Sequence, residues 1–208
     1  MKRTIAETIY QELRERIIYG TLQTGTMLGE QEVADQYGSS KMPVREALHR
    51  LCQEGYLISY PRRGYVVSNI TLEDFAEVQQ VRLPLEMLSV ELIVAHASDE
   101  EIRSLYDIID EPPVEGWGEY WKNSRFHLAL ARLSGNKRLY ASLDHLIGEV
   151  FRAAFRFYPD SVLREQGFHR EVIEALLDRD AERAKQMLRQ DVQTPHYKPD
   201  GARADHNA

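Results

Sequence analysis

Cysteine is almost absent from this chain of 208 residues, in which Cys52 is the one thiol. A single cysteine excludes an intramolecular disulfide, and its position on the apolar face of a predicted helix favours a small core residue over a redox sensor. No apolar run reaches membrane-spanning length, and the first residues lack the pattern of a secretory signal. Together these absences predict a cytoplasmic protein without a membrane partner.

Common enzyme signatures are also missing. The chain has no glycine-rich phosphate loop, no HExxH and no GxSxG. We therefore expect no catalytic residues. A metal-dependent enzyme is kept as the weakest alternative, because two histidines and an acid could hold a metal that activates water.

The most informative segment that is present runs from Gly38 to Ser68. Its first part has apolar residues at i, i+3 and i+4 spacing, which predicts a helix with one buried face. Ser40 is placed to cap this helix, and Pro43 is tolerated in its first turn. Residues 56–60 and 65–68 then predict a hairpin with a basic tip at Pro61–Gly64. A cationic helix start followed by a basic hairpin suits a DNA major groove and the adjoining backbone.

Two upstream helices complete a winged helix-turn-helix pattern. The first spans about Ile5 to Tyr19, with Ile5, Ile9, Leu13 and Ile17 on a four-residue repeat, and the second spans Glu30–Tyr37. Here the chain resembles the GntR-type transcriptional regulators. The residues that match the family pattern are Gly20, Gly25, Leu28, Glu30, Val33, Ala34, Ser40, Lys41, Pro43, Val44, Arg45, Glu46, Ala47, Leu48, Arg63, Gly64, Tyr65, Val66 and Val67. Ser39 and Lys41 depart mildly from the family's usual aliphatic residue and arginine.

The resemblance implies a DNA interface at the recognition helix and the wing. Ser40, Lys41 and Arg45 are expected to reach base edges and phosphates, and the wing to approach the backbone or minor groove. The full predicted interface is Gln31, Ser40, Lys41, Met42, Arg45, Arg62, Arg63 and Gly64. The expected partners are a double-stranded DNA operator with an inverted repeat and a second copy of the chain, which gives a homodimer.

Charge supports two regions with different tasks. Residues 1–69 hold 9 Lys/Arg and 8 Asp/Glu, a net charge of +1, while the remainder has a net charge of −8. An acidic protein still binds DNA when one face is locally basic, and the acidic region should keep away from the duplex.

The second region is predicted to be all helix, so the expected fold class is mainly α. The predicted domains are a winged helix-turn-helix over residues 1–69, a six-helix bundle for effector binding and dimerisation over residues 70–194, and a disordered tail over residues 195–208. The six helices are expected at about Thr71–His96, Ser98–Asp110, Trp117–Leu133, Lys137–Tyr158, Ser161–Leu177 and Ala181–Val192.

This second region resembles the FCD effector-binding domain of one GntR subfamily (the FadR group, in its shorter VanR-like branch). The matching segments are Arg82–Glu86, Asn123–His127, Ser134–Asn136, Phe168–His169 and Asp191. In such domains four side chains hold a divalent metal, which implies the set Asn123, His127, His169 and Asp191. Two members depart from the family pattern, since Asn123 replaces an aspartate and Asp191 replaces a histidine.

Two imidazoles and a carboxylate remain a competent site for zinc, nickel, iron or manganese. The alternative is that both histidines are buried and hydrogen-bonded without metal. No organic cofactor is expected. For a small carboxylate effector, Arg82, Arg152 and Arg156 are the predicted effector-binding residues, because a guanidinium pairs with a carboxylate through two hydrogen bonds. A dimeric DNA-binding scaffold that has lost its effector remains the second hypothesis.

Overall fold

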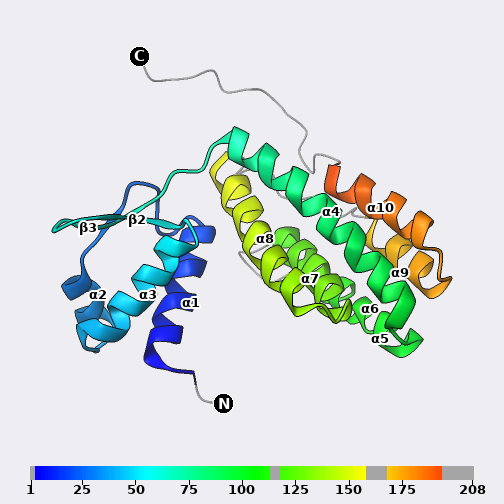
Figure 1. The fold of residues 1–208 in the computed structure, drawn as a ribbon, viewed down its shortest axis with the longest axis horizontal. Helices are drawn as coiled ribbons and strands as arrows, with labels where there is room; N and C mark the ends of the chain where they lie inside the picture. Colours follow the sequence, from blue (N-terminus) through cyan, green and yellow to red (C-terminus); the bar gives the residue numbers. More distant parts are fainter. Residues whose placement is uncertain (1–2, 113–117, 158–167, 194–208) are drawn as a thin grey trace. The chain divides into compact units, whose positions relative to one another are not determined.

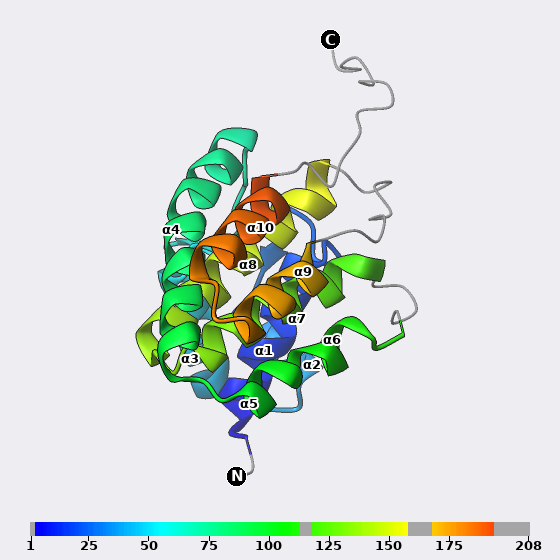
Figure 2. The ribbon, with the colours of Figure 1, turned by 90° about the vertical axis from the view of Figure 1, so that its right-hand side faces the viewer.

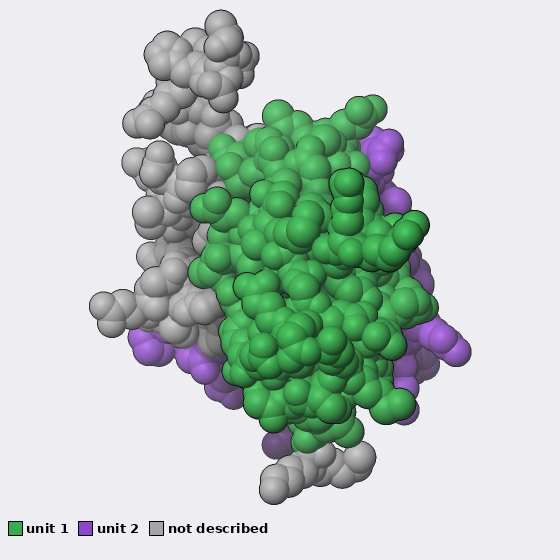
Figure 3. Space-filling model, turned by 90° about the vertical axis from the view of Figure 1, so that its left-hand side faces the viewer, with its two compact units in different colours: residues 1–76, 148–157 green, residues 77–147, 158–208 purple. Residues whose placement is uncertain are grey.

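A computed structural model describes residues 3–112, 118–157 and 168–193. The chain divides into two compact units (Figure 3). Unit 1 comprises residues 1–76 together with Gly148–Phe157, and unit 2 comprises the rest. The division therefore falls after Ala76, seven residues later than the predicted domain boundary at residue 69, and a late segment of the chain returns to unit 1.

Unit 1 has the predicted winged helix-turn-helix fold (Figure 1). Its N-terminal elements are α1 (Ile5–Ile18), β1 (Met27–Leu28), α2 (Glu30–Gln36), α3 (Lys41–Gln53), β2 (Leu57–Tyr60) and β3 (Gly64–Val67). The three strands form an antiparallel sheet in the order β1-β3-β2. The two-residue strand β1 was not predicted, because so short a segment carries no alternating pattern.

The core of unit 1 lies between α1 and α3. Ile9 and Leu13 of α1 and Leu48 and Leu51 of α3 are completely buried. Each such side chain contributes about 1.5–3 kcal/mol when it leaves water. Ile5, which the repeat placed on the same face, is 45% exposed because it occupies the first position of α1, at the open end of the helix.

The wing turn has two unusual backbone positions. The amide of Arg63 donates to the carbonyl of Tyr60, Pro61 holds the second position, and Arg62 has a φ of 64°. These features are typical of a type II turn, which favours glycine or asparagine where Arg62 stands. Gly64 follows with a φ of 110°, and a Cβ there would lie 2.6 Å from the carbonyl oxygen of Leu28. Glycine is therefore required at position 64 by both backbone conformation and space.

The elements from residue 72 onward are helices in the described part of the chain. They are α4 (Leu72–His96), α5 (Asp99–Arg103), α6 (Leu105–Ile109), α7 (Gly118–Leu133), α8 (Lys137–Phe157), α9 (His169–Leu177) and α10 (Ala181–Gln193). Figure 2 shows α9 and α10 side by side. Residues 161–167, the predicted start of the fifth helix, and the predicted tail at 195–208 lie outside the described residues.

The single helix predicted from Ser98 to Asp110 is instead two short helices. Ser98 and Glu101 form a reciprocal capping box at the start of α5. The hydroxyl of Ser104 donates to the carbonyl of Glu101, 2.6 Å away, and the chain turns before α6 begins. Serine side chains compete for backbone groups in this way, which interrupts helices.

Unit 2 is centred on one apolar core. Its buried members come from α4, α5, α6, α7, α9 and α10 and from the residue directly after α4, and they are Val90, Ile93, Ala97, Ile102, Leu105, Phe126, Leu130, Val172, Ile173, Ala175, Leu176, Ala184 and Leu188. Among the described helices none combines the length and the apolar character needed to cross a membrane.

The two constraints on Gly64 predict a measurable loss of stability. Gly64→Ala should lower the melting temperature of the protein, followed by circular dichroism, by more than Gly38→Ala. Gly38 also has a positive φ (58°), but a Cβ there meets no atom within 4 Å. The control change should therefore cost about 1–2 kcal/mol for conformation alone. Equal losses in the two variants would show that the backbone of Leu28 moves aside.

Candidate metal centre and nucleic-acid interface

The predicted DNA-contact residues all lie in unit 1 on α2, on α3 with its cap, or at the wing. Lys41 and Arg45 are exposed, and Met42 is 80% exposed. Ser40 is the N-cap residue of α3, as predicted, but its side chain accepts no capping hydrogen bond. Its hydroxyl is therefore not committed to capping the helix start. Gln31 is exposed on α2 and donates to Asp35, 2.7 Å away.

Arg45 is held in a defined orientation by a carboxylate on α2. Its Nε lies 2.9 Å from Oε1 of Glu30, and its Nη2 lies 2.7 Å from Oε2. Tyr65, on β3, donates its hydroxyl to the same Oε1 at 3.3 Å. The hydrogen bonds from Arg45 hold the pKa of the Glu30 carboxyl below its usual value. One carboxylate thus contacts both the recognition helix and a wing strand.

The tip of the wing carries exposed cations on a strained backbone. Arg62 and Arg63 are both exposed, and Arg62 adopts the left-handed conformation. That conformation costs about 1–2 kcal/mol for a residue other than glycine. Side chains kept in such conformations concentrate at functional sites.

Three predicted metal-ligand residues converge in unit 2. His127 comes from α7, His169 from α9 and Asp191 from α10, and their ligand atoms all lie within 4.8 Å of one another. Nε2 of His127 lies 3.0 Å from Oδ2 of Asp191, and Nε2 of His169 lies 3.4 Å from the same oxygen. The side chains of His127 and Asp191 are almost fully buried.

A buried glutamate determines which nitrogen of His127 faces this cluster. Oε2 of Glu86, on α4, lies 2.7 Å from Nδ1 of His127, and both side chains are 1% exposed. When Nδ1 donates its proton to Glu86, a neutral imidazole presents a lone pair at Nε2. Neither Nε2 of His127 nor Oδ2 of Asp191 has a hydrogen-bond partner among the described residues, although they lie close together. Two buried acceptors facing each other require a cation or a proton between them.

Asn123, the fourth predicted ligand, lies beside His169. Its Nδ2 is 3.3 Å from Nε2 of His169. The nitrogen and oxygen of a side-chain amide exchange places on a half-turn, so the same position can present Oδ1 toward the cluster. Phe126 stacks on the ring of His169 with centroids 4.1 Å apart, which restrains that imidazole.

The pKa values of the cluster reflect burial and mutual charge. Burial, the largest influence, would by itself lower the pKa of His127, but the carboxylates of Glu86 and Asp191 together raise that pKa above its usual value. Burial opposes ionisation of Asp191 as well, and the two imidazoles nevertheless hold its pKa far below the usual range. The donor set of two imidazoles, a carboxylate and an amide oxygen fits a first-row divalent metal.

The three predicted effector-binding arginines are divided between the two units, with Arg82 in unit 2 and the other two in unit 1. Arg82 is buried on α4, where its Nε donates to Oε1 of Glu86 and its Nη1 lies 3.4 Å from the side-chain oxygen of Gln79. Arg82 therefore contacts Glu86, which in turn contacts His127.

Arg152 and Arg156 lie in unit 1, on the last turns of α8. Arg152 is buried and donates to the carbonyl of Ser68, directly after β3. Arg156 donates to the side chains of Asn69 and Thr24. Their role in effector binding stays a prediction. Both arginines hydrogen-bond to the segment that directly follows β3.

Two residues of these sites were not among the predicted site residues. Glu86 could have been found from its spacing of four after Arg82, which favours an ion pair on one helix face. Glu30 belongs to the matched sequence pattern, but its partner Arg45 is fifteen residues away. No local spacing indicates such a pair.

Comparison with known proteins adds independent findings. Residues 5–67 match the gntR family of bacterial regulatory proteins, and residues 77–194 match the FCD domain. The HTH-type transcriptional regulator YdhC of Bacillus subtilis (strain 168) is 30% identical over 188 residues, which cover 85% of this chain and 83% of the relative. The gluconate operon transcriptional repressor of the same organism is 35% identical over 109 residues, covering 52% of this chain and 44% of the relative. The solved structure of E. coli McbR/YncC superposes with a TM-score of 0.76 at 21% identity, covering 93% of this chain and 95% of that one, which shows the shared fold.

The buried pair Arg82–Glu86 predicts a large stability effect. Arg82→Leu should reduce the free energy of unfolding by about 3–5 kcal/mol, because it leaves the Glu86 carboxylate buried without its guanidinium. Arg103→Leu is the matched control, since Arg103 and Asp99 form an i, i+4 pair whose side chains are 61% and 49% exposed. Urea denaturation should show a change of about 0–1 kcal/mol for this control. Equal effects would show that water reaches Glu86.

Proposed function

Because this chain belongs to the GntR family of bacterial regulatory proteins and carries an FCD domain, it is a DNA-binding transcriptional regulator, and we propose that it is a repressor controlled by a small carboxylate. In this proposal a homodimer binds an inverted-repeat operator in the cytoplasm. The relatives named as gluconate operon repressors favour repression over activation.

The exposed start of α3 is the observation that carries the proposal. Lys41, Met42 and Arg45 project from a helix whose other face is buried, so they are available to a major groove. Arg62 and Arg63 are exposed on the wing of the same unit, where they can meet phosphates or the minor groove. The acidic remainder of the chain limits non-specific binding, so affinity should depend on this local basic face.

An apolar stripe on α4 supports the homodimer. Val81 is 55% exposed and Leu88 is 38% exposed, and half-buried Leu85 lies between them at helical spacing. Exposed aliphatic residues along one helix stripe are typical of a contact between proteins. A two-fold contact between two copies of α4 would bring the same stripe from each copy together, which matches the symmetry of an inverted repeat.

The residues that would hold a metal are His127, His169, Asp191 and Asn123. When bound, a divalent metal supplies open coordination positions that carboxylate oxygens can fill. Among the residues around the cluster, Arg82 and Glu86 neutralise each other, and the imidazoles are neutral as ligands. The single negative charge of Asp191 would then neutralise a divalent metal only in part. The remaining positive charge favours an anionic effector. In this arrangement Arg82 would influence effector binding indirectly, because it contacts Glu86 and Glu86 contacts His127.

Coupling between effector and DNA would use α4. Only residues 68–71 separate β3 from this helix, so little slack lies between the wing and α4. Glu86 stands on the same helix and contacts His127. Pro84 lies inside the helix, where a proline removes one backbone hydrogen bond and makes bending easier. An effector that favours one state of α4 would thereby change the operator affinity, provided that it binds the two states unequally.

Selection from a random duplex library should test DNA recognition. The purified full chain should enrich a palindromic sequence, and sedimentation should give two chains per selected duplex. Lys41→Ala should weaken binding to that duplex and lower the slope of log affinity against log salt by about 1, because one phosphate contact is lost.

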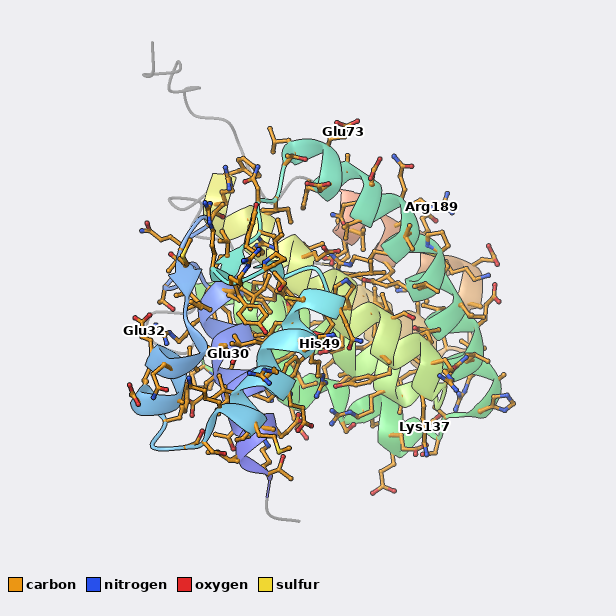
Figure 4. The ribbon with its side chains drawn as sticks, turned by 60° about the vertical axis from the view of Figure 1, so that its left-hand side comes forward. Glu30, Glu32, His49, Glu73, Lys137 and Arg189 are labelled. Carbon is orange, nitrogen blue, oxygen red and sulfur yellow. The ribbon has the colours of Figure 1, made fainter. Side chains whose placement is uncertain are left out.

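Lys137→Ala is the matched control for the DNA test. Lys137 is an exposed lysine at the start of α8 (Figure 4), and its removal should leave the salt slope unchanged. Failure of the wild-type chain to enrich any sequence would overturn the regulator proposal. Enrichment of a non-repeated site by a single chain would overturn only the homodimer.

Elemental analysis of untagged protein should test the metal centre. After incubation with zinc, nickel, iron or manganese and removal of the excess, the chain should retain about one ion. His127→Ala should abolish retention, because Nε2 is lost from the converging set. His96→Ala is the control, since His96 is exposed at the end of α4.

Asn123→Asp should strengthen metal retention, because a charged oxygen replaces a neutral donor. Full-length wild-type protein that retains no ion while still binding its operator would favour a regulator without metal. The effector would then be held by hydrogen bonds, or the chain would be a DNA-binding scaffold, and a thermal shift with small carboxylates separates these two.

A further inference from the structure

The guanidinium group of Arg45 has one edge occupied and one edge available. Its Nε and Nη2 contact the two oxygens of Glu30, which is a side-on pairing. A guanidinium has five N–H donors, so this pairing leaves three, including the end-on fork formed by Nη1 and Nη2. The Arg45 side chain is 65% exposed, and that fork is therefore accessible to a partner.

We propose that Glu30 is a positioning residue for DNA recognition, which holds Arg45 side-on so that its end-on fork is presented to the duplex. This inference rests on the proposed DNA-binding function and names one determinant of its sequence specificity. An end-on fork matches the paired acceptors O6 and N7 of guanine in the major groove. Because Glu30 is itself unable to donate a hydrogen bond when ionised, its role is to orient the arginine.

Glu30 is restrained by more than its arginine. Tyr65, which is 9% exposed on β3, donates to Oε1 of Glu30. Glu30 starts α2, directly after Gly29, so the backbone near the carboxylate is also fixed. Arg45 therefore has its orientation set by two neighbouring elements, α2 and the wing strand.

Stability does not account for this pair. An exposed ion pair typically contributes little to the free energy of unfolding. Glu30 also places a negative charge close to a surface that would approach phosphates, which by itself weakens DNA binding. A carboxylate at this position is therefore expected to have a compensating function, and orientation of the fork supplies one.

Glu30→Gln tests the inference, with Glu32→Gln as its matched control. Both glutamates lie in the first turn of α2, so both changes remove one charge and the same interaction with the helix dipole. Glu32 is exposed, whereas Glu30 is half-buried, and both are labelled in Figure 4. The measurements are fluorescence anisotropy on the selected duplex and on a scrambled duplex of equal length.

Wild-type protein should prefer the selected duplex, and Glu30→Gln should reduce the ratio of the two affinities by about tenfold, as expected for loss of one bidentate base contact. Affinity for the scrambled duplex should be unchanged or higher. Glu32→Gln should change both affinities equally and keep the ratio. In an Arg45→Lys background, which lacks the fork, Glu30→Gln should have no further effect on the ratio.

Each outcome separates this inference from the proposed function. A Glu30→Gln variant that keeps the wild-type ratio would overturn the positioning role while leaving DNA recognition intact. A Glu30→Gln variant whose affinity rises more for the selected duplex than for the scrambled duplex would show that Glu30 screens the charge of Arg45. That result would also overturn the positioning role. Absence of any preference in the wild-type chain would instead reject the proposed function. Unchanged melting temperatures of the variants would exclude misfolding as the cause.

Discussion

The buried carboxylate of Glu86 is the constraint on which the arrangement of unit 2 depends. It accepts hydrogen bonds from Arg82 on its own helix and from His127 on α7, and it is 1% exposed. Removing a carboxylate from water costs several kcal/mol, which only well-placed partners offset. Any arrangement of α4 against α7 that separates Glu86 from these partners is therefore strongly disfavoured.

The same contact determines the chemistry of the cluster. A proton held on Nδ1 of His127 leaves Nε2 as an acceptor, directed at Asp191. Nε2 lies 3.0 Å from Oδ2 of Asp191, and neither atom has an assigned hydrogen-bond partner among the described residues. A proton or a divalent cation between Nε2 of His127 and Oδ2 of Asp191 would satisfy both buried atoms.

Local spacing in the sequence predicted most of the fold, because burial of one helix face depends on spacing alone. Val44, Leu48 and Leu51 predicted α3 in this way, and all three are fully buried. Contacts between residues far apart in the sequence could not be predicted from local spacing. The spacing of Arg152 and Arg156 indicates a shared face of α8, but it carries no information about Ser68, which lies 84 residues before Arg152 in the sequence. The convergence of the predicted metal ligands was implied by family resemblance rather than by spacing.

Arginine–carboxylate pairing occurs in both units, and solvent exposure explains its different roles. The side chains of Arg82 and Glu86 are 6% and 1% exposed, so neither can exchange its partner for water, and the pair mainly fixes structure. The side chains of Arg45 and Glu30 are 65% and 24% exposed, so their pair adds little stability. It does order a long side chain before any partner arrives. Ordering such a side chain during binding costs about 0.5–1.5 kcal/mol. An arginine that is already oriented avoids that cost. This advantage is limited to partners whose acceptors match its end-on fork.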